Sequence, residues 1–367
     1  MKTSYPKAKI KAVLLEGVHP TGATLLRAEG FQVEAHAASA DGAKLKKLAA
    51  DAHIIGIRSK TDLTADILAA APRLLAVGCF CIGTNQVDLA NARLRGVPVF
   101  NSPFSNTRSV AELTIAEVVA LYRRLTDKAV QMHAGLWDKS AAGAHEVRGR
   151  TLGIVGYGHI GSQVSVLAEA FGMRILYYDI AAKMQLGNAR PVKTLAELLK
   201  ESDVVTLHVP ATPATHNMIG AAQIKRMKPG AYLINNSRGS VVDIAALAEA
   251  IRTGHLAGAA LDVFPDEPAG RGQSFESPLR GLPNVILTPH VGGSTEEAQE
   301  TIADDVCTKL TKFINIGSTT GAVNVPEVEL QAQGAPGSAD DDDRPGDPRP
   351  RPHRILHFHR NVPGVLS

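Results

Sequence analysis

The chain has 367 residues and a formal net charge of +3, and 44% of its residues are hydrophobic. This length and apolar content predict two packed domains, and the small net charge gives no sign of a nucleic-acid or membrane-surface partner. No apolar run reaches the roughly 18 residues of a membrane helix, and the N-terminal run at 12–15 is too short for a signal peptide, so we expect a cytoplasmic protein. The three cysteines suggest no disulfide framework, and we expect no metal site.

Strands and helices alternate through the first part of the chain, which predicts a parallel α/β domain. We predict strands over 11–15, 31–35, 54–57, 74–78 and 97–101, and helices over 21–28, 44–50 and 65–71. Arg58, Ser59 and Lys60 follow the third strand, at a carboxyl end of the kind where open α/β sheets bind ligands. Two cations beside a serine suit an anion, although a solvated loop explains these residue types equally well.

A long apolar-faced helix is predicted over 109–126, with Ser109 and Glu112 spaced as in a capping box. We expect this helix to link the two domains. The segment 131–150 follows it and contains the single tryptophan, Trp137, together with Lys139. That tryptophan fits either a core or a subunit interface, and its polar, small-residue surroundings favour the interface.

A glycine-rich turn is the motif around which the second domain is organised. Gly156, Gly158 and Gly161 form a G-x-G-x-x-G pattern between an apolar strand and a helix, and Asp179 ends the next strand about 20 residues on. The first glycine would permit the tight turn, the second would let the backbone approach a pyrophosphate, and the third would let the helix pack on the strand. The helix N-terminus would face the phosphates. Asp179 would bind ribose hydroxyls and repel a 2′-phosphate, which favours NAD over NADP.

The rest of the dinucleotide domain continues the alternation as far as residue 293. Predicted strands cover 152–155, 174–178, 204–207, 232–235, 256–261 and 285–287, and predicted helices cover 162–171, 195–200, 222–227 and 244–251. A helix predicted over 295–316 would then carry the chain back to the first domain. We therefore predict a discontinuous substrate-binding domain (1–106 and 294–330) and an inserted dinucleotide domain (107–293). Residues 331–352 have the composition of a disordered linker.

Three side chains near the ends of the dinucleotide strands have the chemistry of a hydroxyacid oxidation. Arg238 could hold a substrate carboxylate with its planar guanidinium. His290 could take the hydroxyl proton, because it titrates near neutrality. Glu267 could orient His290 and stabilise its charged form. Spacing alone leaves this triad a moderate hypothesis, since a chain of this size has other arginines, glutamates and histidines.

Several longer stretches carry a resemblance to a known family. Residues 235–239 (NNSRG), 261–268 (LDVFPDEP) and 287–293 (LTPHVGG) resemble the D-2-hydroxyacid dehydrogenase family, and in that family the matching Arg, Glu and His are catalytic. Residues 78–88, 101–112 and 156–161 resemble members of the family that oxidise 3-phosphoglycerate. The resemblance covers about residues 9–330. It implies two doubly wound parallel-sheet α/β domains, a Rossmann NAD-binding domain inserted into a flavodoxin-like substrate-binding domain.

The resemblance also implies an activity, a cofactor and a set of binding residues. The activity is NAD-dependent oxidation of 3-phosphoglycerate to 3-phosphohydroxypyruvate in serine synthesis, with 2-oxoglutarate reduction as a side activity. The expected substrate-binding residues are Arg58, Ser59, Lys60, Asn106 and Lys139. The expected cofactor-binding residues are Gly156, Gly158, His159, Ile160, Gly161, Asp179, His208, Asn236, Ser237, Asp262, Gly292 and Gly293. A homodimer is expected from the family.

Some residues depart from the family pattern, and two rival functions stay open. Lys60 stands where similar enzymes usually have an arginine, and Ala37 where some have a lysine, which weakens the inference of phosphate binding. Residues 353–367 resemble the start of an ACT regulatory domain whose remainder is missing, so we expect no serine feedback. The first rival is another D-2-hydroxyacid dehydrogenase, acting on glycerate or lactate. The second is a non-catalytic dinucleotide-sensing scaffold.

Overall fold

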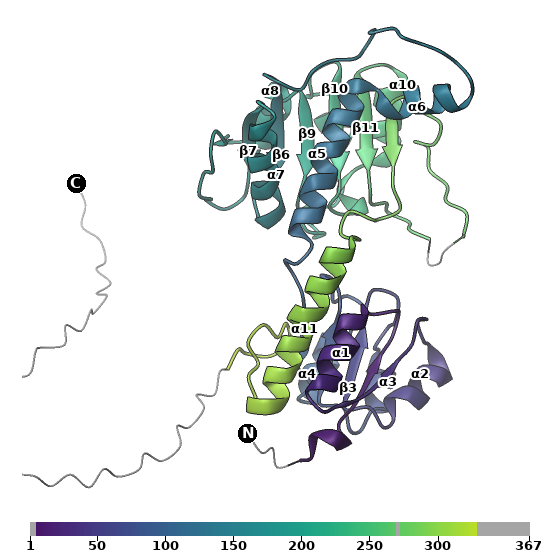
Figure 1. The fold of residues 1–367 in the computed structure, drawn as a ribbon. Helices are drawn as coiled ribbons and strands as arrows, with labels where there is room; N and C mark the ends of the chain where they lie inside the picture. The colour runs from purple at the N-terminus through teal and green to yellow at the C-terminus, as the bar shows by residue number, and fades with distance from the viewer. Residues whose placement is uncertain (1–4, 269–271, 329–367) are drawn as a thin grey trace, which may run out of the picture. The chain divides into compact units, whose positions relative to one another are not determined.

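The computed structural model describes residues 5–268 and 272–328, which form two parallel β-sheets flanked by helices (Figure 1). In the first sheet every neighbouring pair is parallel and the order is β2-β1-β3-β4-β5, the strand order of flavodoxin-like folds. The strands are β1 (Lys11–Leu14), β2 (Gln32–Ala35), β3 (Ile54–Ile57), β4 (Ala76–Cys79) and β5 (Val99–Asn101). The helices on this sheet are α1 (Pro20–Ala28), α2 (Gly42–Ala49), α3 (Ala65–Ala69), α4 (Leu89–Leu94) and α11 (Glu296–Ile316), after a 3-10 turn, η1 (Lys7–Lys9).

The second sheet is also parallel throughout, in the order β12-β11-β10-β9-β6-β7-β8. Counted from its own first strand, this is the Rossmann order with one strand added at the edge. The strands are β6 (Thr151–Val155), β7 (Arg174–Tyr178), β8 (Arg190–Pro191), β9 (Val204–Leu207), β10 (Ala231–Asn235), β11 (Leu256–Leu261) and β12 (Val285–Leu287). The helices are α5 (Thr107–Arg123), α6 (Leu125–His133), α7 (His159–Ala170), α8 (Leu195–Glu201), α9 (Ala221–Ile224) and α10 (Ile244–Arg252), with a 3-10 turn, η2 (Gly239–Val241). The expected fold class is therefore confirmed.

Each sheet buries both faces, which explains why its central strands are apolar along their whole length rather than alternating. All four residues of β3 and all five of β6 are buried. One core lies between the first sheet and α2, α3 and α4, and another between that sheet and α1 and α11. The second sheet likewise separates a core with α8, α9 and α10 from a core with α5 and α7.

Two long helices begin where the chain passes between the sheets. The helix α5 packs on the second sheet through Ala111, Ile115 and Val118. The helix α11 lies along α1 on the first sheet, and Gly78 of β4 permits this, because a Cβ there would lie 2.8 Å from Cγ1 of Val306 (Figure 1). The two connections are joined near the helix starts, where the hydroxyls of Ser109 and Thr295 are 2.9 Å apart.

The predicted boundaries of the linking helix are wrong at both ends. The helix starts at Thr107 with Asn106 as its N-cap, so Ser109 lies inside the first turn and the expected capping box is absent. Glu112 instead pairs with Arg108, with 2.6 Å between Oε1 and Nε. At the other end Arg124 has a φ of +50°, which ends α5 and separates it from α6. The short elements α4, α6 and β8 were not predicted.

The three cysteines form no disulfide within the described part of the chain. Cys79 and Cys307 are buried and Cys81 is half-buried, and all three are free thiols. Burial raises the pKa of Cys81 to about 11 and that of Cys307 to about 12. These thiols therefore stay protonated at neutral pH. Among the described residues no cluster of His, Cys, Asp and Glu could hold a metal ion.

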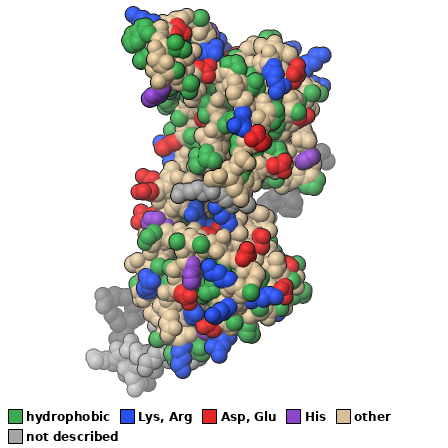
Figure 2. Space-filling model, turned by 90° about the vertical axis from the view of Figure 1, so that its right-hand side faces the viewer, with side chains coloured by type: hydrophobic (Ala, Val, Ile, Leu, Met, Phe, Trp, Pro, Cys, Tyr) green, Lys and Arg blue, Asp and Glu red, His purple; other side chains and the backbone are tan. Residues whose placement is uncertain are grey.

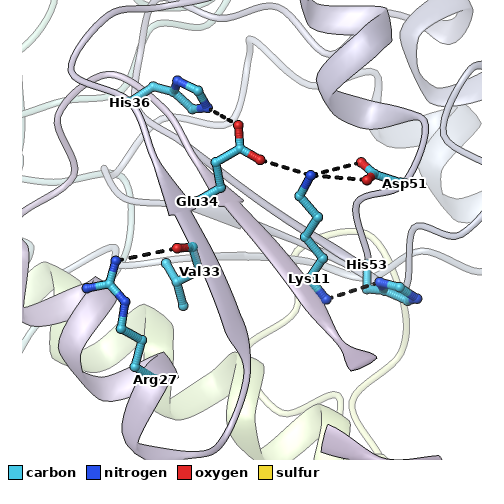
Figure 3. A network of polar contacts seen from close by, with 7 residues as sticks. All are labelled: Lys11, Arg27, Val33, Glu34, His36, Asp51 and His53. Atoms are coloured by element: carbon cyan, nitrogen blue, oxygen red, sulfur yellow. Dashed lines mark hydrogen bonds and ion pairs between the residues drawn. The ribbon is translucent and has the colours of Figure 1, made fainter. Parts of the chain in front are cut away.

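A polar network links β1 and β2 to the residues before β3 in the first sheet (Figure 3). Nζ of Lys11 lies 2.9 Å from Glu34 and 3.1 Å from Asp51, and Nε2 of His36 lies 2.9 Å from the other Glu34 oxygen. The hydrogen bond from Lys11 lowers the pKa of Glu34, despite its partial burial. Lys11 and Asp51 lie at the amino ends of β1 and β3, whereas Glu34 lies near the carboxyl end of β2 and His36 follows it. The network therefore ties neighbouring strands together, and we assign it to stability.

Figure 2 shows basic and acidic side chains interspersed over one face, as the small net charge leads one to expect. In the part of the chain that the structure describes, no helix is long and apolar enough to cross a membrane. The predicted linker (331–352) and the predicted ACT remnant (353–367) lie outside the described residues.

Candidate active site

The glycine turn after β6 has the geometry that its sequence predicts. Gly156 has a φ of +90°, and a Cβ there would lie 2.3 Å from the carbonyl oxygen of His208. A Cβ on Gly161 would lie 2.2 Å from the carbonyl oxygen of Gly156. Two of the three glycines are therefore required by the fold, one for the turn and one for the packing of α7 on it.

Gly158 is different, because nothing lies within 4 Å of where its Cβ would be. It is the N-cap of α7 and provides no side chain to cap the helix, so the first N–H groups of α7, from His159 onward, face open space. One Asp179 oxygen accepts a hydrogen bond from the Tyr157 amide at 2.8 Å, which places the carboxylate beside the turn. This arrangement fits a dinucleotide: space and N–H groups for a pyrophosphate and an acid for a ribose.

His208 reaches the same place from the end of β9. Its carbonyl contacts Gly156, and its Nε2 lies 3.1 Å from Oγ1 of Thr206. Burial lowers the pKa of His208 to about 3, so the ring is neutral at neutral pH. Its Nδ1 is buried without a partner among the described residues. The ring thus offers an unused nitrogen beside the turn.

His290 and Glu267 form the central pair of the predicted triad. Nδ1 of His290 lies 2.9 Å from Oε2 of Glu267, and Oε1 of Glu267 accepts a hydrogen bond from the Phe264 amide at 3.1 Å. The bond to Glu267 raises the pKa of His290, against the effect of burial. Burial raises the pKa of Glu267, but its bonds with His290 and Phe264 and the charges of His290 and Arg238 outweigh this, so the net pKa is lowered. The pair is therefore arranged to leave Nε2 of His290 free for a proton.

The loop that carries His290 is held by Asp262, which is 2% exposed. Asp262 accepts hydrogen bonds from the Thr288 hydroxyl at 2.6 Å and from the amides of Val291 and Gly292 at 2.8 and 2.7 Å. His290 itself has a φ of +55°, a left-handed conformation that is uncommon for a non-glycine residue. Backbone strain of this kind clusters at functional sites. Asp262, expected as a cofactor ligand, thus has a structural task in this loop.

Arg238 follows β10 and enters the same site. Gly239, the next residue, lies against the backbone of Phe264 and Pro265, and a Cβ there would be 1.9 Å from the Phe264 carbonyl carbon. This close approach brings the Arg238 turn against the loop that carries Glu267. The charge of Arg238 acts on both Glu267 and His290, and its Nη1 donates to the Ser237 carbonyl at 2.7 Å. The structure thus brings the three predicted catalytic residues together.

Two residues expected to bind the cofactor, Asn236 and Ser237, direct their side chains to partners within the protein. Ser237 donates from its amide and hydroxyl to Oδ1 of Asn235. The Asn236 amide donates to Oε2 of Glu117 at 2.6 Å and to Oγ1 of Thr114 at 3.1 Å. Side-chain contact between a cofactor and Asn236 would have to use its Oδ1, which is buried and unpartnered among the described residues.

Glu117 is a buried carboxyl that the sequence analysis missed. It is 3% exposed on α5, and burial raises its pKa to about 7. Its charge is coupled to Asp262, which holds the His290 loop. Its position in the apolar stripe of α5 was a signal that could have found it, because a glutamate there is expected to be buried and to need a polar partner.

The predicted anion site after β3 is built on the first sheet. The amides of Lys60 and Thr61 donate to the two carboxylate oxygens of Glu16 at 2.9 and 2.8 Å, and the Arg58 carbonyl accepts from Gln86. Neither Arg58 nor Lys60 forms an ion pair among the residues with described structure. The backbone of this loop is thus fixed by Glu16 and Gln86, two residues that the sequence did not single out, and both cations remain available.

The remaining predicted residues lie elsewhere. Asn106 packs on Gly293, where a Cβ would lie 2.1 Å from its Nδ2. Lys139 is exposed in the segment after α6. Within the described ranges, the structure gives no contact with the triad for Asn106 or Lys139, nor for Arg58 or Lys60. Two cavities of about 620 and 490 Å³ are lined by other residues than the triad.

The fold and the triad geometry together define a class of enzyme. Residues 115–292 match the model of the D-isomer specific 2-hydroxyacid dehydrogenase NAD binding domain. The chain belongs to the D-isomer specific 2-hydroxyacid dehydrogenase family. The domain built on its second sheet is the NAD-binding domain.

Comparison with individual relatives narrows the match from the family to enzymes named for one substrate. The D-3-phosphoglycerate dehydrogenase of Haemophilus influenzae is 52% identical over 100% of this chain and 86% of its own length. The enzyme of the same name from Escherichia coli K12 is 53% identical, over 100% of this chain and 85% of its own length. D-3-phosphoglycerate dehydrogenase 1 of Saccharomyces cerevisiae is 54% identical, over 99% and 76%.

Solved structures of the family share the fold. A D-2-hydroxyisocaproate dehydrogenase matches with a TM-score of 0.78 and 26% identity, over 86% of this chain and 100% of its own. The D-lactate dehydrogenase of Aquifex aeolicus, complexed with NAD and lactic acid, matches with a TM-score of 0.74 and 30% identity, over 86% and 100%.

Proposed function

We propose that this chain catalyses the NAD-dependent oxidation of D-3-phosphoglycerate to 3-phosphohydroxypyruvate. The observation that carries the proposal is identity above one half, over the whole chain, to enzymes named for that substrate in two bacteria and a yeast. The solved lactate and hydroxyisocaproate enzymes are much less similar in sequence. Serine biosynthesis is the corresponding role.

The roles of the catalytic residues follow from the site geometry. Arg238 holds the substrate carboxylate through its planar guanidinium. Nε2 of His290 takes the hydroxyl proton, because Nδ1 is engaged by Glu267. Glu267 then stabilises the imidazolium. NAD supplies the acceptor for the hydride.

The cofactor-binding roles are proposed on the shape of the glycine turn. The open space at Gly158 and the N–H groups of His159 and Ile160 support pyrophosphate binding. The position of Asp179 supports ribose binding. His208, Ser237, Asp262 and the Gly292–Gly293 turn would line the nicotinamide side.

The substrate phosphate is assigned to the first sheet. Arg58 and Lys60, which carry no ion pair in the described structure, would bind it with Ser59, and Asn106 and Lys139 would add contacts. This assignment goes with the division into a substrate-binding domain (1–106 and 294–330) and an inserted NAD-binding domain (107–293). Packing of α11 on α1 and β4 supports the division.

A homodimer is proposed on the character of α6 and the segment after it. None of the residues of α6 is buried, yet the stretch exposes Leu125, Val130, Met132, Leu136 and Trp137. Apolar side chains gathered in this way mark interaction surfaces. Trp137, 80% exposed, is not a core residue of this chain. A cytoplasmic location and 2-oxoglutarate reduction stay predictions.

The test is NADH formation with D-3-phosphoglycerate, D-glycerate and D-lactate. We expect kcat/KM for D-3-phosphoglycerate to exceed the other two values by at least about tenfold, because the two cations pair with its phosphate. The variant Arg58→Gln/Lys60→Gln should lose that preference and keep its turnover of D-glycerate.

Three outcomes would overturn parts of this proposal. A preference for glycerate or lactate would make the chain a different member of the family. Undiminished activity of His290→Ala would remove the assigned base. No turnover of any hydroxy acid, with NAD still bound, would favour a dinucleotide-sensing scaffold.

A further inference from the structure

A polar cavity of about 490 Å³ lies at the amino edge of the second sheet, where β6, β9, β10 and β11 begin. The carboxyl edge of the same sheet carries the glycine turn and the triad. Because a five-residue strand is about 16 Å long, the cavity is separate from the proposed NAD site. Its volume is in the range of small-molecule sites, which is about 300–1,000 Å³.

The wall of the cavity contains two buried phenols with unused hydroxyls. Tyr122, near the end of α5, and Tyr232, in β10, are 3% and 4% exposed, and their ring centroids are 4.7 Å apart. Neither hydroxyl has a hydrogen-bond partner in the described structure. The rings are buried, but neither hydroxyl oxygen is among the buried unpartnered atoms, so both hydroxyls are accessible from the cavity. Burial raises the pKa of both tyrosines, so each keeps its proton and can donate it.

Three cations line the same cavity, and one of them forms no ion pair in the described structure. Lys228 pairs with Asp203 at 2.8 Å, and Arg124 pairs with Asp127 at 2.9 Å. Arg150 lines the cavity and forms no ion pair among the described residues, although its charge acts on Tyr122, Tyr232 and Asp203. The two phenol donors thus share the cavity with a guanidinium that forms no ion pair, and the three cations outnumber the two acids paired with them.

We infer that this cavity binds a small molecule through a phosphate or carboxylate group, held by Arg150 and by the hydroxyls of Tyr122 and Tyr232. Hydrogen bonds from neutral donors and a guanidinium are the usual combination for an oxyanion. The two acids in and beside the cavity, Asp203 and Asp127, are already paired with Lys228 and Arg124. The positive charge of Arg150 is therefore left over, and it favours a negatively charged ligand. The site is remote from the proposed catalytic residues and goes beyond the dehydrogenase reaction.

The probe is inorganic phosphate, titrated into the full chain at constant ionic strength and followed by calorimetry. Phosphate would also bind at Arg58 and Lys60 if the proposed function is correct, so the measurement is made in an Arg58→Gln/Lys60→Gln background. Saturable binding should remain there. Adding Arg150→Gln should weaken it at least tenfold, and so should Tyr122→Phe/Tyr232→Phe, which removes two oxygens and little else.

The matched control is Arg148→Gln, which removes an equal charge two residues away, from a side chain that is 80% exposed. It should leave phosphate affinity within twofold. The inference is overturned if the Arg58→Gln/Lys60→Gln protein binds no phosphate, or if the Arg150 and tyrosine variants bind it as tightly as their parent. Neither result depends on turnover, so failure here leaves the proposed function standing.

Discussion

At the scale of single residues, the site depends on hydrogen bonds that fix a histidine in an unfavourable backbone conformation. His290 has a φ of +55°, and Asp262 accepts three hydrogen bonds from the loop around it. The residue types of the triad could be predicted from the sequence, since each has a distinct chemical task. The hydrogen-bond partners of Asp262 and Glu117 could not, because both acids bond to residues far away in the chain.

The first residue-scale prediction concerns Glu267→Gln. The carboxylate of Glu267 raises the pKa of His290, and oxidation requires the neutral ring, so kcat/KM falls as the pH drops below that pKa. Removing the negative charge lowers the pKa of His290 and should move the acid limb of the pH profile to lower pH. The plateau should fall on the order of 10²–10⁴-fold, because the imidazolium loses its partner.

The control for this prediction is Glu276→Gln. Glu276 is also a glutamate of the region between β11 and β12, but it is exposed and pairs with Arg280. It should leave the profile of kcat/KM against pH unchanged. An acid limb that stays in place in Glu267→Gln would show that His290 is not the titrating base.

At the scale of elements, the β6–α7 turn separates glycines that the fold needs from one that a ligand would need. A Cβ on Gly156 or Gly161 would collide with backbone oxygens of the protein itself, whereas a Cβ on Gly158 would meet nothing within 4 Å. The sequence motif already predicts a different role for each glycine. The tertiary structure adds the distances on which these roles depend.

This difference predicts opposite outcomes for two similar substitutions. Gly161→Ala should lower the free energy of unfolding by about 1–3 kcal/mol, because the added methyl overpacks the turn. Gly158→Ala should change it by less than about 0.5 kcal/mol, as surface substitutions do. It should instead raise the KM for NAD by on the order of tenfold, since the methyl occupies the space left for a pyrophosphate.

Unfolding in denaturant measures the free energy of unfolding of each variant. The initial rate at increasing NAD concentrations measures the KM for NAD. Comparable destabilisation by both substitutions would contradict the assignment of the open space at Gly158. So would an unchanged KM for NAD in Gly158→Ala.

At the scale of the whole molecule, the apolar stretch from α6 to Trp137 has no partner within the described chain that buries it. If it joins two subunits, Trp137→Ala should weaken dimerisation at least tenfold, because aromatic anchors dominate such interfaces. The free energy of unfolding of the monomer should change by less than about 0.5 kcal/mol. Sedimentation velocity over a range of concentrations measures the dimer.

Leu94→Ala is the matched control, since Leu94 is 85% exposed on α4, on the first sheet. It should leave the dimer unaffected. A wild-type chain that sediments as a monomer at all concentrations, or a Trp137→Ala variant with wild-type association, would contradict the proposed interface.

The alternation of strands and helices, the glycine turn with its acid, and the three residue types of the triad could all be predicted from the amino-acid sequence. These features depend on local chemistry: a buried parallel strand must be apolar, a tight turn needs glycine, and proton transfer near neutral pH suits histidine. Tertiary structure alone decided which helix packs on which sheet. It also set the break of α5 at Arg124, the Asp262 and Glu16 bonds that hold the two loops, and the cavity between Tyr122, Tyr232 and Arg150. Each of these joins residues distant in sequence, so no local pattern records it.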